Sequence, residues 1–350
     1  MKSILITGGA GFIGTNFTRM LLAERPGLRV TVLDALTYAG NIENLAGLEE
    51  EHGGRYRFVR GDITDGDAVA AVFRDSAIDA VVHFAAESHV DRSILGPMAF
   101  VETNVLGTAT LLEAARKAWS SGSGRFLQVS TDEVYGALGE EGFFREDSPI
   151  NPSSPYSASK AAADHLALSY HKTFGLDVVL TRCCNNYGPY QFPEKLIPLM
   201  VLRLQEGKPL PVYGDGKNVR DWIHVEDHNR GVLAALENGA EGEVYNLGAR
   251  CERRNIDLVR TLIEQYCSLI GEDPAKGEDR ITFVKDRPGH DWRYAIDPTR
   301  AERELGFQPE ISFQEGISDT IRWYLDHADW CRRIQTGEYR QWVRDLYGDD

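Results

Sequence analysis

The sequence of 350 residues lacks the features of membrane-spanning and nucleic-acid-binding proteins. No apolar run approaches the roughly 18 residues that suggest a transmembrane helix, and the apolar stretch at residues 2–7 meets glycine before the core of a signal peptide could form. No run of Lys or Arg occurs, and the formal net charge is −15. We therefore expect no membrane span and no nucleic-acid partner, because contacts to nucleic-acid phosphates need a basic patch.

Cysteine is also scarce. The five cysteines are odd in number and show no Cys-x-x-Cys spacing, which argues against a disulfide framework and against a zinc site. Cys183 and Cys184 end an apolar strand pattern, where buried thiols are ordinary packing. We predict a cytoplasmic protein without a metal site.

Short apolar segments alternate with longer helical patterns through about residue 182, and prolines then interrupt this rhythm. Such alternation is typical of a parallel sheet covered by helices on both faces. The predicted fold is α/β: a Rossmann-type doubly wound parallel sheet with a smaller C-terminal substrate-binding lobe over the carboxyl ends of the strands, where ligands bind. We assign residues 1–184 to the sheet domain, with 224–250 returning to it, and residues 185–223 and 251–350 to the lobe.

A glycine-rich turn follows the first predicted strand. Gly8, Gly11 and Gly14 allow a tight turn, close approach of a pyrophosphate and close packing of the next helix. Asp34 ends the second predicted strand, where its carboxylate would accept hydrogen bonds from an adenosine ribose and repel a 2′-phosphate. No Arg adjoins Asp34, so the pattern favours NAD over NADP.

Tyr156 and Lys160 are spaced i, i+4 and therefore share one face of a predicted helix. A cation beside the phenol favours the phenolate, which lets Tyr156 act as a base near neutral pH. The pair suggests oxidation of an alcohol by a nicotinamide. Taken alone, the same spacing also fits a plain pair on a helix surface.

Asp132 and Glu133 are adjacent acids at the end of a predicted strand. Two carboxyls in one site repel when both are ionised, so one tends to keep its proton. One acid and one base are what the elimination of water needs. A solvated strand end or a helix cap is the alternative reading, but together with the Tyr156–Lys160 pair the acids indicate an internal redox dehydratase.

Longer segments resemble the extended short-chain dehydrogenase/reductase superfamily and, within it, the dTDP-glucose 4,6-dehydratases. The resemblance covers the chain essentially from end to end. The Asp-Glu pair and the segment from Arg287 are specific to the dehydratase subgroup. The matching segments are TGGAGFIG from Thr7, LTYAGN from Leu36, AAESHVDRSI from Ala85, STDEVYG from Ser130, SPYSASKA from Ser154, NNYGPYQFPEKLIPL from Asn185, RDWIHVEDH from Arg220 and RPGHDWRYAID from Arg287.

This resemblance implies a role for each catalytic residue. Tyr156 would take the proton of the C4 hydroxyl while C4 gives a hydride to NAD. Lys160 would hold the nicotinamide ribose and lower the pKa of Tyr156, and Thr131 would hydrogen-bond the C4 oxygen. Glu133 would then remove the C5 proton, and Asp132 would protonate the departing C6 hydroxyl. Because the hydride returns to C6, NAD should stay bound between turnovers.

The resemblance also implies two sets of binding residues. The cofactor set comprises Gly8, Gly11, Phe12, Ile13, Gly14, Asp34, Leu36, Thr37, Asp62, Ile63, Phe84, Ala86, Ser88, Thr103, Tyr156, Lys160 and Asn186. The set for dTDP-glucose comprises Ser88, Thr131, Asn185, Lys195, Leu196, Pro211, Tyr213, Arg220, Asn255, Arg287, His290 and Tyr294.

Two departures from the family pattern concern binding rather than catalysis. Ala35 follows Asp34 where a Lys is frequent, and Cys251 replaces a common polar residue. The long helices predicted at 99–118 and 157–174 carry Ala-rich faces, and relatives pair these helices in a four-helix bundle, so we expect a homodimer.

Three other functions stay open on the sequence. A UDP- or GDP-sugar dehydratase would keep both acids and bind another base, and an NDP-hexose 4-epimerase would need the Tyr, Lys and Thr without the acids. An NAD-sensing binding protein would keep the glycines and could lose the catalytic groups.

Overall fold

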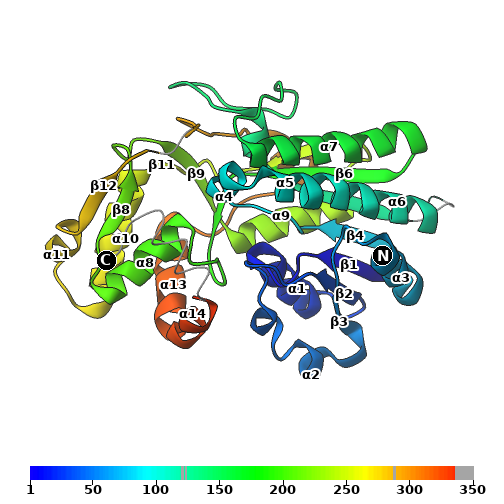
Figure 1. Ribbon diagram of the computed structural model, residues 1–350, viewed down its shortest axis with the longest axis horizontal. Coiled ribbons are helices and arrows are strands. Elements are labelled where there is room, and N and C mark those ends of the chain that lie inside the picture. The colour runs from blue at the N-terminus through cyan, green and yellow to red at the C-terminus, as the bar shows by residue number, and fades with distance from the viewer. Residues whose placement is uncertain (120–121, 123, 287–288, 336–350) are drawn as a thin grey trace.

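A parallel sheet of seven strands forms the centre of the larger part of the molecule (Figure 1). The computed structural model describes residues 1–119, 122, 124–286 and 289–335. The strand order is β10-β6-β5-β4-β1-β2-β3, and every neighbouring pair is parallel. The predicted fold class, a Rossmann-type doubly wound sheet, is confirmed. The strands are β1 (Ser3–Thr7), β2 (Arg29–Asp34), β3 (Tyr56–Arg60), β4 (Ala80–His83), β5 (Arg125–Thr131), β6 (Asp177–Cys183) and β10 (Val244–Leu247).

Strand side chains alternate between two apolar cores, one on each face of this sheet. Ile4 and Ile6 of β1 pack in the core that holds α1 and α9, whereas Leu5 packs in the core that holds α3, α6 and α7. Both faces are therefore covered, which explains why the strands read as continuous apolar runs. The covering helices are α1 (Phe12–Glu24), α3 (Gly66–Ser76), α6 (Thr108–Ala118), α7 (Pro155–Phe174) and α9 (Val225–Asn238).

The turn between β1 and α1 requires glycine. Gly8 has a φ of 70°, and a Cβ at Gly14 would lie 2.3 Å from the Gly8 carbonyl oxygen. Helix α1 begins after Gly11, which offers no side-chain cap to its amino end. The first backbone N–H groups of α1 are therefore available to an anionic ligand.

Helix α7 begins at a capping box. The Ser154 hydroxyl accepts a hydrogen bond from the Ser157 N–H (3.1 Å), and the Ser154 N–H donates to the Ser157 hydroxyl (3.0 Å). Pro155 occupies the first turn, where its missing N–H is harmless. This start fixes Tyr156 in the first helical turn and Lys160 one turn later, both facing the sheet.

The segment predicted as one helix over 99–118 consists of three pieces. α5 (Pro97–Phe100) continues into the π-helical η3 (Val101–Gly107) and then into α6. π-Helical turns widen a helix locally and are frequent at functional sites. The sequence also shows helical patterns at 256–269 and 313–325, which form α10 (Asn255–Ile270) and α13 (Phe313–Asp326), and an apolar segment at 245–247, which lies in β10.

The smaller lobe, on the left in Figure 1, has a separate apolar core built on two small sheets. One sheet has the order β11-β9-β7, and β12 pairs with β8 in the other. These strands were missed in the sequence because each is six residues or shorter, and β8 also contains Pro211. The elements are β7 (Asn185–Tyr187), α8 (Leu196–Glu206), β8 (Leu210–Tyr213), β9 (Val219–His224), β11 (Glu252–Arg254), α10 (Asn255–Ile270), α11 (Ala275–Glu278), β12 (Ile281–Val284), α13 (Phe313–Asp326) and α14 (Ala328–Ile334).

Short elements fill the connections. They are η1 (Ile42–Leu45), α2 (Leu48–His52), η2 (Gly53–Arg55), α4 (Val90–Leu95), η4 (Asp132–Tyr135) and α12 (Thr299–Leu305). None of the helices in the described ranges has the length and apolarity needed to cross a membrane.

Candidate active site

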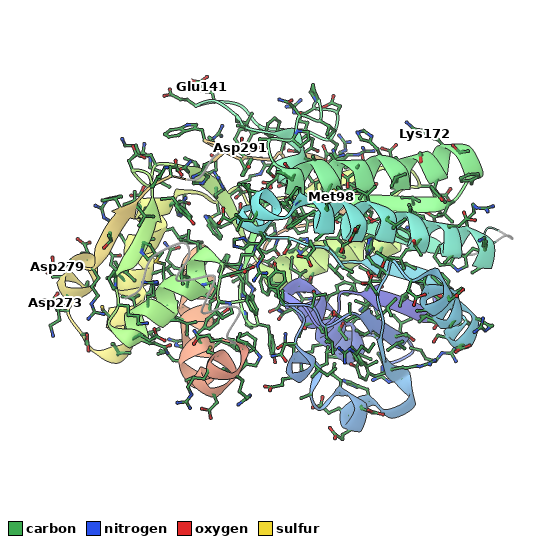
Figure 2. All side chains as sticks on the ribbon, in the orientation of Figure 1. Met98, Glu141, Lys172, Asp273, Asp279 and Asp291 are labelled. Atoms are coloured by element: carbon green, nitrogen blue, oxygen red, sulfur yellow. The ribbon has the colours of Figure 1, made fainter. Side chains whose placement is uncertain are left out.

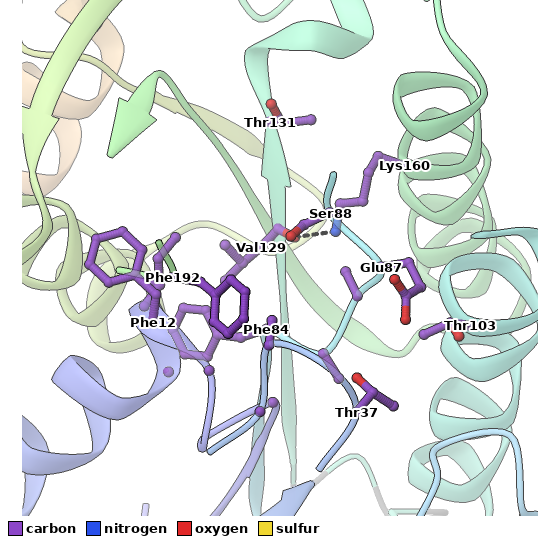
Figure 3. Close-up of a pocket in the computed structure, with 18 of the residues that line it drawn as sticks. Phe12, Thr37, Phe84, Glu87, Ser88, Thr103, Val129, Thr131, Lys160 and Phe192 are labelled. Carbon is purple, nitrogen blue, oxygen red and sulfur yellow. Dashed lines mark hydrogen bonds between the residues drawn. The ribbon is translucent and has the colours of Figure 1, made fainter. Parts of the chain in front are cut away.

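A cavity of about 310 Å³ lies at the carboxyl ends of the central strands, where the lobe meets the sheet (Figure 3). All five predicted catalytic residues line it, although they come from three elements. Thr131 ends β5, Asp132 and Glu133 begin η4, and Tyr156 and Lys160 lie on α7. The fold therefore brings the predicted oxidation pair and the predicted elimination pair into one cavity.

Most of the predicted cofactor set lines the same cavity. Leu36 does not, and its N–H instead donates to the Asp34 carboxylate at 2.8 Å. The lining members are Gly8, Gly11, Phe12, Ile13, Gly14, Asp34, Thr37, Asp62, Ile63, Phe84, Ala86, Ser88, Thr103, Tyr156, Lys160 and Asn186.

The Asp34 carboxylate is held by backbone donors on both of its oxygens. Oδ2 accepts from the Ala10 N–H at 2.9 Å and Oδ1 from the Leu36 N–H. Burial raises the pKa of Asp34, and these two hydrogen bonds oppose that rise. The carboxylate is thus oriented toward the glycine turn before any ligand binds.

Asn104 on η3 is a positioning residue that the sequence analysis missed. Its side-chain oxygen accepts from the Glu87 N–H (2.9 Å), and its Nδ2 donates to the Glu87 carbonyl (3.0 Å) and to the Ser159 hydroxyl (2.8 Å). One amide therefore fixes the cavity loop after β4 against α7. The available signal was a lone Asn, fully buried here, inside an otherwise Ala- and Leu-rich helical pattern.

Lys160 and Tyr156 are both buried among protein groups. The Lys160 ammonium donates to the Val129 carbonyl at 2.8 Å (Figure 3). Burial lowers the pKa of Lys160, while Asp164 and Cys183 raise it. Burial raises the pKa of Tyr156 well above its usual value, and Glu133 adds to the rise while a hydrogen bond with Thr131 opposes it. The lowering expected from Lys160 is therefore not produced by the protein groups alone.

Asp132 and Glu133 sit in different surroundings although they are adjacent. The Asp132 side chain is buried, and its Oδ2 has no hydrogen-bond partner among the described residues. Burial raises the pKa of Asp132 well above its usual value, and the negative charges of Glu133 and Asp221 add to the rise. Glu133 is only partly buried, and its N–H donates to the Thr131 hydroxyl at 3.3 Å. The pair thus consists of a buried carboxyl with a raised pKa and a more exposed carboxyl.

Part of the predicted sugar-nucleotide set reaches the cavity. Ser88, Thr131, Asn185 and Lys195 line it, and the Lys195 ammonium donates to the Ser88 carbonyl at 3.1 Å. Arg287 lies outside the described residues. The members that do not line the cavity are Leu196, Pro211, Tyr213, Arg220, Asn255, His290 and Tyr294.

The Arg220 guanidinium contacts other residues of the lobe. Its guanidinium donates to the carbonyls of Val219 (2.7 Å) and Asp291 (3.0 Å) and lies 4.3 Å from the centre of the Tyr294 ring. Its positive charge opposes the rise in the pKa of Asp132. Besides the predicted role in binding, Arg220 therefore acts electrostatically on the candidate acid.

His290 and Tyr213 pack edge to face with ring centres 6.1 Å apart, at the surface of the small β8–β12 sheet. The His290 Nδ1 lies 2.6 Å from an Asp286 carboxylate oxygen. Asp291 accepts hydrogen bonds from the hydroxyls of both Ser153 and Tyr294. These contacts link the lobe to the start of α7.

Three features define a short-chain dehydrogenase/reductase that uses NAD: a doubly wound sheet with a glycine turn, an acid at the end of β2 that suits an adenosine ribose, and a Tyr-Lys pair beside the strand ends. Within that class, the chain belongs to the dTDP-glucose 4,6-dehydratase family. A family model described as GDP-mannose 4,6 dehydratase matches residues 5–320.

Curated and solved relatives agree with this assignment. The chain is 52% identical over 351 residues to the dTDP-glucose 4,6-dehydratase of Xanthomonas campestris pv. campestris (strain B100), covering 97% of this chain and 98% of the relative. It matches the crystal structure of a Streptomyces venezuelae dTDP-glucose 4,6-dehydratase with NAD bound at 50% identity and a TM-score of 0.87, covering 95% and 99%. The Bacillus anthracis enzyme in complex with NAD matches at 44% identity and a TM-score of 0.85, covering 95% and 100%.

Proposed function

We propose that this protein converts dTDP-glucose to dTDP-4-keto-6-deoxyglucose and water, with NAD as a cofactor that stays bound through the cycle. The observation that carries the proposal is the split acid pair. Asp132 is buried and has a raised pKa, Glu133 is more exposed, and both share a cavity with Tyr156 and Lys160. An enzyme that only moved a hydride would have no use for this pair.

The residues present fit NAD. Side chains at Gly8 or Gly14 would collide with backbone, so the turn leaves room for close approach of a pyrophosphate to the start of α1. Asp34 would accept hydrogen bonds from the adenosine ribose, and Lys160 would reach the nicotinamide ribose. When bound, NAD supplies the acceptor and later the donor of one hydride.

Tyr156 acts first, as the base for the C4 hydroxyl. Its raised pKa means that the phenol keeps its proton when only protein groups surround it, so a nearby positive charge is needed to favour the phenolate. Thr131, already hydrogen-bonded to Tyr156, would hold the C4 oxygen. Lys160 contributes its charge from one helical turn away.

Elimination follows because a C4 ketone makes the C5 proton acidic. Glu133 removes that proton, and Asp132 delivers its own proton to the departing C6 hydroxyl. Burial and the charges of Glu133 and Asp221 raise the pKa of Asp132, which favours the protonated form that this step needs. Positioned acid and base groups of this kind contribute on the order of 10²–10⁴ in rate.

The proposal also assigns residues to the recognition of the nucleotide base. Pro211, Tyr213, Asn255 and His290 are the residues we assign to it, with Arg220, Lys195 and Asn185 for the diphosphate and sugar. We assign NAD binding to residues 1–184 and 224–250, and nucleotide-sugar binding to 185–223 and 251–350.

Incubation with dTDP-glucose, UDP-glucose and GDP-mannose, followed by mass spectrometry, tests the proposal. Loss of one water from dTDP-glucose at the highest kcat/KM is the expected result. Unchanged mass with inverted C4 indicates a 4-epimerase. Preferred dehydration of UDP-glucose or GDP-mannose means that the enzyme recognises another nucleotide base than thymine. No product from any of them indicates a binding protein.

We also infer that the protein is a homodimer. Apolar side chains are exposed side by side along α4, α5 and η3: Leu95 at 78%, Met98 at 64% (Figure 2), Val101 at 46% and Leu106 at 55%. Pairing η3–α6 and α7 with their copies in a four-helix bundle would cover this surface. Leu106→Asp should convert a dimer to a monomer in light scattering at micromolar concentration, whereas Phe283→Asp on the exposed lobe strand β12 should not. A monomeric unmodified protein contradicts this inference.

A cytoplasmic location is the remaining proposal. All five cysteines are free thiols, and four of them are buried. Unpaired thiols are typical of a reducing compartment.

A further inference from the structure

An ion pair lies fully buried behind the cavity. The Arg182 Nε of β6 donates to the Asp164 carboxylate of α7 at 3.0 Å, and the two side chains are 4% and 1% exposed. Replacing such a pair by apolar groups of the same volume is often neutral or stabilising. Stability alone therefore does not explain why both charges are present at this place.

Asp164 lies one helical turn after Lys160, on the same buried face of α7. Three titratable groups act electrostatically on or with the Lys160 ammonium: Asp164 on the same helix, Cys183 of β6 and His83 of β4. Tyr156 lies one turn earlier on the same helix. Asp164 has an ionised partner in Arg182, and it favours the protonated form of Lys160 against the effect of burial.

The other end of the pair reaches η4, which carries the two acids. Arg182 Nη1 donates to the Tyr135 hydroxyl at 2.9 Å, and the guanidinium lies 4.8 Å from the centre of the Tyr135 ring. The Tyr135 hydroxyl donates onward to the Asn246 side-chain oxygen of β10 at 2.9 Å. Tyr135 is the last residue of η4, three positions after Asp132.

One buried network therefore touches both halves of the reaction. At one end, Asp164 lies one helical turn from Lys160 of the oxidation pair. At the other end, Tyr135 holds η4, which carries Asp132 and Glu133 of the elimination pair. No member of the network lines the cavity.

We propose that Asp164 and Arg182 are positioning residues: Asp164 keeps Lys160 in its charged form, and Arg182, through Tyr135, fixes η4 against the sheet. This inference rests on the proposed function. It predicts that the two ends of the network fail at different steps of the reaction.

Asp164→Asn tests the first end. In a Glu133→Gln background, elimination is blocked, so the absorbance of the reduced nicotinamide reports the oxidation of dTDP-glucose alone. Without the Asp164 charge, Lys160 loses its proton at lower pH, and the unpaired Arg182 acts in the same direction. The alkaline limb of the oxidation rate should move to lower pH by about one unit or more, and Asp164→Glu should restore it.

Asp177→Asn is the matched control. Asp177 also pairs with an arginine across β5 and β6, through the Arg125 Nε at 2.8 Å, but at the amino ends of these strands. Its loss should leave the alkaline limb in place. If Asp164→Asn lowers the rate equally at every pH, or leaves the limb unmoved, the inference is wrong.

Tyr135→Phe tests the second end in the otherwise unmodified protein. It removes only the hydroxyl between Arg182 and Asn246. We expect the reduced nicotinamide to accumulate during turnover, exchange of the C5 hydrogen with deuterated solvent to fall at least about tenfold, and the oxidation limb to stay in place. Unchanged C5 exchange would overturn this half.

The double variant Asp164→Asn/Arg182→Met distinguishes a folding defect, because it removes both charges of the pair and leaves neither Asp164 nor Arg182 without its partner. The double variant should fold, and the alkaline limb of its oxidation rate should lie at lower pH than in Glu133→Gln alone. An alkaline limb at the unchanged pH overturns the inference. The proposed function is checked in the same experiment. If Glu133→Gln alone forms no reduced nicotinamide with dTDP-glucose, that function fails, whereas failure of the network leaves this signal intact.

Discussion

The two sides of the cavity are built in different ways. On the sheet side, short continuous segments at strand ends supply the lining, and backbone geometry fixes them, as at Gly8, Gly14 and Asp34. On the lobe side, the residues assigned to the sugar nucleotide come from several separate segments, and most of them do not line the cavity. The contrast indicates that the sheet side is formed in advance, whereas the lobe side depends on how the small β8–β12 sheet sits against its surroundings.

The largest effect should follow from adding one methyl group on the sheet side. In Gly14→Ala the Cβ would lie 2.3 Å from the Gly8 carbonyl oxygen, so the turn must move. We expect purified Gly14→Ala to contain no NAD and to have no measurable activity, as judged by nucleotide analysis of the denatured protein. Gly27→Ala, where the added Cβ meets open space, is the control and should retain NAD. A Gly14→Ala protein with full NAD content would show that the turn does not hold the cofactor.

Next in size are two substitutions that separate the chemistry of the sheet side. Glu133→Gln should lose about 10²–10⁴ in kcat, accumulate reduced nicotinamide and exchange almost no C5 hydrogen. Tyr156→Phe should lose a similar factor but form no reduced nicotinamide, because the C4 hydroxyl keeps its proton. Stopped-flow absorbance and deuterium incorporation measure both. Near-normal dehydration by Glu133→Gln would make the acid pair structural and favour the epimerase reading.

On the lobe side, the effect should fall on binding rather than on chemistry. Tyr213→Ala removes an aromatic face beside His290 and should raise KM for dTDP-glucose about tenfold with kcat little changed. Phe283→Ala, on the adjacent strand and 58% exposed, is the matched control and should change neither. If Tyr213→Ala lowers kcat with KM constant, the lobe takes part in the reaction step and the contrast between the two sides is lost.

The smallest effect concerns acid stability. Burial lowers the pKa of His83, on the sheet, and of His228, on α9, to about 3 each, from an ordinary value of 6.5. Below about pH 6.5 these histidines bind protons in the unfolded chain but stay neutral in the folded protein. The free energy of unfolding therefore decreases as pH falls from about 6.5 toward 3. Each histidine should contribute on the order of 1 kcal/mol of loss at about pH 5.5.

Urea unfolding at pH 7 and at pH 5.5 measures this loss. His228→Gln should show a smaller difference between the two pH values than the unmodified protein. His171→Gln is the control, because His171 is only partly buried near the end of α7. An equal pH dependence in all three proteins would contradict the assignment to buried histidines.

Much of the sheet side could be predicted because its signals are local. Parallel strands buried on both faces give continuous apolar runs, and a dinucleotide turn needs its glycines within seven residues, from Gly8 to Gly14. Asn104 escaped notice because its function depends on a loop 17 positions away in the sequence, at Glu87. The strands of the lobe were not predicted because they are short, and one of them, β8, also contains a proline.

The sequence by itself determined the fold class, the glycine turn, the spacing of Tyr156 and Lys160 and the adjacency of Asp132 and Glu133, since each of these is written within a few consecutive residues. Only the tertiary structure decided that the pKa of Asp132 is raised, because that depends on burial and on Asp221 and Arg220, nearly ninety positions along the chain. It likewise decided that the Arg182–Asp164 pair connects the two catalytic elements. Burial and charge are set by all the neighbours of a group, and most of those neighbours are distant in sequence.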